Sequence, residues 1–222
     1  MLLPMPAGSI ADSPFKYREI EVEGWSVLVQ QELYDHAELR PRVLAYLTIK
    51  LWEVARRLPA PVVKRLQKVT IRMHLDREGC PGGVYHPSPE WLREHQLPPE
   101  WGRGIEFGNA RNFLDWSLQQ PAMVLHELAH AWEHQVMDAE QRGEIQAVLD
   151  ATIESNQLEQ SLYVTGGRNR AYALNNRQEF FAEMSEAWWW TNDIFPFVRG
   201  EILDEFPEVV RLMESCWQAP PD

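Results

Sequence analysis

Three residues within five positions of the chain have the types and the spacing needed to activate water at a metal ion: His126, Glu127 and His130. On a helix, residues four apart lie one above the other on the same face, so both imidazoles can direct a nitrogen at one ion. Zinc accepts such nitrogen ligands at about 2.0–2.1 Å. The carboxylate of Glu127, beside the first imidazole, could take a proton from a zinc-bound water during attack and pass it to a leaving amine.

The stretch around these residues, 121–136, is expected to be a buried helix. Pro121 suits its first helical position. Its apolar residues recur at helical spacing: Met123, Val124, Leu128, Ala131, Trp132 and Val136. The pattern H-E-x-x-H on a helix is the arrangement found in zinc peptidases. The alternative is a metal-free core helix whose histidines are satisfied by other side chains.

His134 follows the same helical face but lies too far away to share the ion. It is two turns beyond His126, about 12 Å along the axis. It is therefore expected either at the surface or in contact with a ligand side chain, without binding the ion itself. A longer zinc pattern with a third histidine is excluded, because Glu133 and Val136 stand where glycine and histidine are required. The third protein ligand of a catalytic zinc must therefore come from elsewhere.

Several acidic residues after the motif are candidates for that third ligand. Glu154 lies on the next expected helix, whose acids most simply face solvent. Glu179, Glu183 and Glu186, spaced by four and three residues, form an acidic stripe on a later helix. A solvated acidic face is one interpretation of this stripe. The helix is also dense in aromatic residues, however, and a buried carboxylate needs a partner such as a metal ion. The remaining candidates are Glu144, Asp150 and Glu159.

The motif and the later helix together resemble the catalytic domain of anthrax lethal factor and its relatives. The resemblance rests on "HELAH" at 126–130, on "EFFAE" at 179–183, and on Tyr172, seven residues before that second segment. The two segments are 179 − 130 = 49 residues apart. Lethal-factor-like enzymes are zinc endopeptidases of the glutamate-ligand zincin class, the gluzincins. The resemblance covers mainly the C-terminal hundred residues, and the N-terminal hundred carry no matching segment.

This resemblance implies a role for each matching residue. Glu127 is the implied general base, and Tyr172 matches a tyrosine that stabilises the transition state or protonates the leaving group. Glu183 matches an outer carboxylate that orients a ligand histidine. The implied ligands of one catalytic Zn²⁺ are His126, His130 and Glu179.

The elements that position these residues are predicted from apolar periodicity. Residues 17–30 alternate as two short strands around Gly24, and residues 67–75 read as another strand. Apolar residues at helical spacing predict a helix over 39–58, and Ser88-Pro89 is typical of a short helix start.

Strands early in the chain and helices after Pro121 define an α+β fold, with a small N-terminal mixed sheet and a mostly helical C-terminal half. The length of 222 residues suits one domain with a single core. The resemblance implies that this domain, residues 1–222, is a zincin-like catalytic domain. The segment 1–14 is expected to be irregular.

The segment 104–110 is a candidate substrate-binding strand, since it stands directly ahead of the motif helix. In zincins generally, an edge strand before that helix pairs with extended substrate through main-chain bonds. Ile105, Glu106 and Phe107 are therefore expected to bind the substrate backbone. A plain structural strand is the alternative interpretation.

The net charge restricts the binding partners of the protein, and the cysteines bear on its cellular compartment. The formal net charge of −12 argues against nucleic acid or an anionic membrane surface as the main partner. A peptide or protein substrate is compatible with it, and the oligomeric state stays open. Two cysteines favour free thiols and a reducing compartment such as the cytoplasm, whereas secretion is possible if a leader was removed. The main function predicted is a zinc metallopeptidase, and the alternative is a zincin-fold regulatory or interaction protein without peptidase activity.

Overall fold

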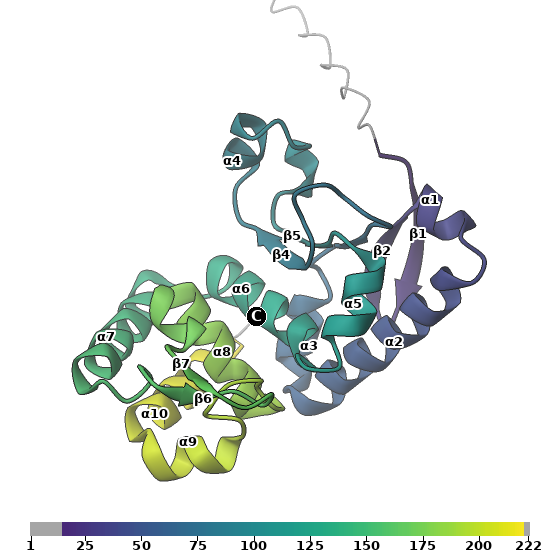
Figure 1. Ribbon diagram of the computed structural model, residues 1–222. Coiled ribbons are helices and arrows are strands. Elements are labelled where there is room, and N and C mark those ends of the chain that lie inside the picture. Colours follow the sequence, from purple (N-terminus) through teal and green to yellow (C-terminus); the bar gives the residue numbers. More distant parts are fainter. Residues whose placement is uncertain (1–14, 220–222) are drawn as a thin grey trace, which may run out of the picture.

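Within residues 15–219, which the computed structural model describes, the strands of the N-terminal half form a five-stranded mixed sheet (Figure 1). The strand order is β1-β2-β3-β5-β4. The central pairs β2–β3 and β3–β5 are parallel, and the outer strands run antiparallel to their neighbours. The strands are β1 (Tyr17–Val22), β2 (Trp25–Gln30), β3 (Ile71–Met73), β4 (Gly83–His86) and β5 (Gly104–Phe107). The expected irregular segment 1–14 lies outside the described residues.

The hairpin expected around Gly24 is confirmed. Glu23 and Gly24 both have positive φ, 51° and 85°, which is the turn chemistry that joins two twisted antiparallel strands. The strand expected over 67–75 is shorter. Gln67 and Val69 still belong to the turn that ends the preceding helix, and the backbone N–H of Val69 donates to the carbonyl of Leu66 at 2.9 Å.

Helices flank the sheet and form most of the C-terminal half. Before the motif they are α1 (Gln31–Asp35), α2 (Leu39–Arg57), α3 (Ala60–Leu66), α4 (Pro89–Glu94), a 3-10 turn η1 (Pro99–Trp101) and α5 (Ala110–Trp116). From the motif onward they are α6 (Met123–Gln135), α7 (Ala139–Ser155), the 3-10 turn η2 (Tyr172–Asn175), α8 (Arg177–Trp189), α9 (Arg199–Glu205) and α10 (Pro207–Cys216). A small ribbon of β6 (Ser161–Leu162) and β7 (Arg168–Asn169) lies between α7 and η2.

The predicted helix 39–58 corresponds to α2, which buries its apolar stripe and ends before Pro59, where the preceding residue turns to extended backbone. The short helix at Ser88-Pro89 is α4, and the hydroxyl of Ser88 caps it by accepting from the backbone N–H of Trp91 at 3.1 Å. The chain is an α+β protein with a small mixed sheet and a mostly helical C-terminal half.

Helix α6 lies between the sheet and the C-terminal helices (Figure 1). One side packs against β4 and β5, and another side packs against α8. Leu125, Leu128 and Trp132 are fully buried on it. The indole of Trp132 donates to the carbonyl of Cys216 at 2.8 Å and stacks on Trp217, which ties the motif helix to α10 and the C-terminal residues. The central helix is thereby fixed on both sides.

The prediction that residues 104–110 form an edge strand for substrate binding is wrong. The segment around Ile105, Glu106 and Phe107 is β5, which lies between β3 and β4 and is buried along its whole length. The Glu106 carboxylate is held by Arg77 and by Nε2 of His86 at 2.9 Å. The expectation failed because β4, which precedes β5 in the chain, folds back antiparallel outside it. Within the described residues, β4 pairs only with β5 and lies at one edge of the sheet, opposite the edge formed by β1.

Cys80 and Cys216 are buried and free, as expected. Among residues 15–219, no helix combines the length and the apolar character that crossing a bilayer requires.

Candidate metal centre

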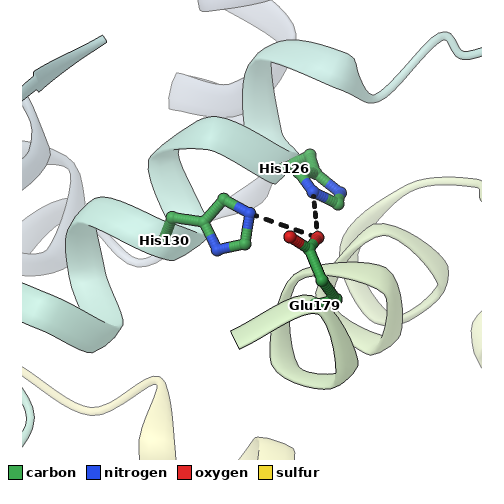
Figure 2. A group of neighbouring side chains, drawn as sticks. All are labelled: His126, His130 and Glu179. Carbon is green, nitrogen blue, oxygen red and sulfur yellow. Dashed lines mark hydrogen bonds and ion pairs between the residues drawn. The ribbon is translucent and has the colours of Figure 1, made fainter. Parts of the chain in front are cut away.

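Two helices bring the expected ligands together. His126 and His130 stand one turn apart on α6, with their ring centroids 4.7 Å apart and their planes nearly perpendicular. Glu179 lies in the first turn of α8, which Asn176 caps by accepting from the backbone N–H of Glu179 at 2.9 Å. Figure 2 shows the carboxylate of Glu179 reaching across to both rings. A spacing of 49 residues in sequence therefore becomes a contact between neighbouring helices.

The geometry of this group fits a tetrahedral zinc ion. Oε2 of Glu179 lies 3.1 Å from Nε2 of His126 and 3.4 Å from Nε2 of His130. Ligand atoms at about 2.1 Å from a tetrahedral ion are separated by roughly 3.4 Å, so these two oxygen–nitrogen distances are close to those a bound ion would require. The ligand atoms of all three residues lie within 4.8 Å of one another. Two nitrogens and one oxygen also match the donors that catalytic zinc takes from proteins.

Hydrogen bonds between these side chains shift their pKa values in opposite directions. Burial alone would lower the pKa of His126, but hydrogen bonds to the carboxylates of Glu179 and Glu186 outweigh burial and raise that pKa well above its usual value. Burial alone would raise the pKa of Glu179, whereas hydrogen bonds with His126 and His130 lower it to about 2. The metal-free group is therefore a paired cation and anion, and a metal ion must displace a proton to bind.

Glu127 lies on α6 beside this group, and it is almost completely buried. Burial raises the pKa of Glu127, opposed by His130 and His126. Gly83 of β4 leaves the space that this carboxylate occupies, because a Cβ at position 83 would stand 2.8 Å from Oε1 of Glu127. The edge strand and the carboxylate are thus in direct contact. A proton acceptor beside a metal group is the arrangement that the motif predicts.

Tyr172 begins η2 and is half exposed, with 49% of its surface accessible. It lines the same cleft as His126, Glu127 and Glu179. Burial and the nearby charge of Glu179 raise the pKa of Tyr172, so its phenol keeps its proton and can donate a hydrogen bond. The structure thus brings together the residues that the sequence predicted as base, ligands and transition-state tyrosine.

The outer partner of His126 is Glu186 rather than Glu183. Oε1 of Glu186 accepts from Nδ1 of His126 at 2.7 Å, whereas Oε1 of Glu183 lies 3.9 Å from that nitrogen, beyond hydrogen-bonding distance. Glu183 instead accepts from the amide of Asn192 at 2.9 Å. The signal that could have found Glu186 is its place seven residues after Glu179, two helical turns along the same face.

We expect Glu186→Ala to weaken zinc binding by roughly 10–100-fold, the usual cost of losing the outer partner of a ligand histidine. The reason is that Nδ1 of His126 loses the acceptor that fixes its ring. Competition with a chelator of known affinity measures the change. Glu183→Ala is the matched comparison, since it removes a carboxylate one turn away on the same helix, and it should cost far less. An equal loss in both variants would contradict the assignment of this role to Glu186.

Two further residues that were considered as metal ligands, His134 and Glu154, lie away from the candidate metal group. His134 is separate from it, as expected, and its Nδ1 is 2.8 Å from the phenol oxygen of Tyr85. Glu154 is exposed on α7 and belongs to neither group of described side chains that could hold a metal. The second such group comprises His126, Glu183 and Glu186, and it shares one histidine with the first.

The candidate metal group, His126, His130 and Glu179, opens into a cleft beside the edge strand β4. A cavity of about 320 Å³ is lined by Gly83, Val84 and Tyr85 of β4 and by the ligand side chains. Glu133 also lines it, but its carboxylate is neutralised by Arg177 at 2.9 Å and by Arg142. The cleft therefore combines a strand edge, a candidate metal group and a buried carboxylate.

Comparison of the chain with protein-family models, with curated proteins and with solved structures finds no match.

Proposed function

We propose that the protein is a zinc-dependent metallopeptidase, a gluzincin of the type that lethal factor represents, with a zincin-like fold. The observation that carries this proposal is the convergence of His126, His130 and Glu179 at the separations of a tetrahedral site, with the Glu127 carboxylate beside them. A module that only bound zinc would have no need of a buried proton acceptor at that point. The glycine that makes room for this acceptor supports the same reading.

When bound, zinc would polarise the scissile carbonyl and lower the pKa of a water molecule in the cleft. Glu127 accepts the proton of that attacking water and delivers it to the leaving amine, and its raised pKa brings the carboxyl closer to the operating pH. Tyr172 donates its phenolic hydrogen to the developing oxyanion. Glu186 holds the ring of His126 in the orientation that presents Nε2 to the metal.

The substrate would be an extended peptide or protein segment added to the edge of the sheet at β4. Strand addition uses main-chain hydrogen bonds, so it fixes the register of a peptide without reading its sequence. Gly83 of β4 supports this placement, because it lies against the Glu127 carboxylate and lines the same cleft. A peptide along β4 would thereby pass directly over the proposed base.

The test is metal removal and replacement with a peptide library as substrate. Purified protein should hold close to one zinc per chain, lose cleavage on treatment with 1,10-phenanthroline, and regain it with stoichiometric zinc. Mass spectrometry of the products and elemental analysis of the protein measure the two quantities. Zinc without any cleavage would favour the regulatory alternative. Absence of zinc after metal-replete purification would contradict both and leave a metal-free helix with paired histidines.

A further inference from the structure

A second cavity, of about 380 Å³, continues from the catalytic cleft. It shares Gly83, His126, Glu127 and Tyr172 with the first cavity, so any group that fills it lies next to the reacting bond. It is not needed to hold the zinc ligands or the base. A side chain of a peptide in the cleft is the natural occupant of such a space.

The second cavity has apolar and aromatic walls beside a group of carboxylates. Trp116, Tyr163 and Ile194 contribute the apolar walls. Glu183 and Asp193 add carboxylates beyond the metal group, and no lysine or arginine lines the cavity within residues 15–219. An apolar shaft with carboxylates suits a long cationic side chain, whose methylene stem packs on the walls while its charged end reaches the acids.

Glu183 points to the same kind of occupant. Its side chain is more than nine-tenths buried, with 8% exposed. Asn192 holds Oε2, but within the described residues Oε1 accepts no hydrogen bond, and the nearest cation, His126, is already engaged by Glu186. A cation in the cavity that donates to Oε1 would give this mostly buried side chain a second hydrogen bond.

Asp193 has a neutral partner only. Its Oδ2 accepts from the side-chain amide of Gln120 at 3.3 Å. By contrast, Glu133 in the first cavity is paired with two arginines of the chain itself. Glu133 is therefore neutralised by the chain itself, whereas no lysine or arginine of the described residues lines the cavity beside Glu183 and Asp193. This asymmetry distinguishes the second cavity from an ordinary acidic surface.

We propose that the second cavity is a specificity pocket for an arginine or lysine side chain adjacent to the scissile bond. This inference rests on the proposed function. The guanidinium or ammonium group donates to Glu183 and Asp193, and the rings of Trp116 and Tyr163 can face the cation. The substrate class is a peptide with a basic residue at the cleavage point. The chain's own charge of −12 also favours approach of basic segments.

Peptides that differ at one position test the pocket. Arginine, lysine, citrulline and norleucine are compared at each position next to the cleaved bond, since citrulline keeps the shape of arginine without its charge. We expect kcat/KM for the arginine peptide to exceed that for citrulline by roughly tenfold or more. Asp193→Asn should reduce this ratio, and Glu183→Gln should reduce it further. Glu140→Gln, an exposed acid on α7, is the matched control and should leave the ratio unchanged.

Ligand binding provides a readout that does not depend on cleavage. N-acetylarginine amide and N-acetylcitrulline amide are titrated into the full chain by calorimetry. Tighter binding of the arginine compound, reduced by Asp193→Asn, supports the pocket. Equal binding of both compounds, or cleavage without any preference for a basic residue, overturns it. If no peptide is cleaved, the proposed function fails, and the titration still decides whether this cavity binds a cation.

Discussion

Glu127→Gln is expected to lower kcat/KM for peptide cleavage by roughly 10²–10⁴-fold, the contribution typical of a positioned general base. Glutamine preserves the size of the side chain and its place beside Gly83, but it cannot accept the proton of the attacking water. Because Glu127 belongs to neither group that could hold a metal, zinc content should stay close to that of the unmodified chain. Cleavage kinetics and elemental analysis of one preparation measure both quantities.

Glu140→Gln is the matched control, because Glu140 is exposed on α7. It should change neither the cleavage kinetics nor the zinc content. Melting temperature, followed by circular dichroism, confirms that the Glu127 variant is folded. Two results would count against the assigned role. One is cleavage at the original rate, and the other is loss of zinc together with loss of cleavage, since a proton acceptor should be separable from the ligands.

Glu179→Ala is expected to have the larger effect on the metal. Removing an outer partner costs roughly 10–100-fold in affinity, and removing a direct ligand should cost more than that. Glu179→Ala also leaves the two histidines of α6 without the carboxylate that both face. Competition with a chelator gives the affinity, and peptide cleavage should disappear in parallel.

Glu154→Ala is the matched comparison for this experiment. Glu154 is the glutamate that the sequence left as an alternative ligand, and it is exposed on α7. Zinc affinity and cleavage should both be retained in this variant. If zinc were released by Glu154→Ala but not by Glu179→Ala, the assignment of the third ligand, and the resemblance that suggested it, would be wrong.

Local periodicity accounts for the parts of the fold that were predicted correctly. The hairpin at Gly24, the helix 39–57 and the helix that carries His126 follow from residue spacing within a few turns of chain. The order of strands is different, because it depends on how distant segments pair. The stretch from Ile105 to Phe107 reads as a strand, but nothing within it records that β4 covers its outer side. For that reason the edge strand was misassigned.

The same distinction applies to the site. His126, Glu127 and His130 are related by the geometry of one helix, so their mutual positions could be derived from spacing alone. Glu179 lies on another helix, and its selection over Glu154 came from a resemblance rather than from spacing. The hydrogen bond that engages Glu186 in place of Glu183 depends on the packing of α8 against α6, which no residue pattern specifies.

Gly83 has a consequence for how the sequence can diverge. It belongs to no motif, and its neighbours on β4 carry ordinary side chains, yet a single added methyl group would approach both Glu127 and Phe107 within 3.0 Å. In homologous proteins, glycine at 83 should therefore be inherited together with glutamate at 127. Lineages that lose the glutamate would keep only the contact with Phe107, so the restriction to glycine would be weaker there. Covariation between positions 83 and 127 would thus indicate which homologous proteins retain a proton acceptor at 127.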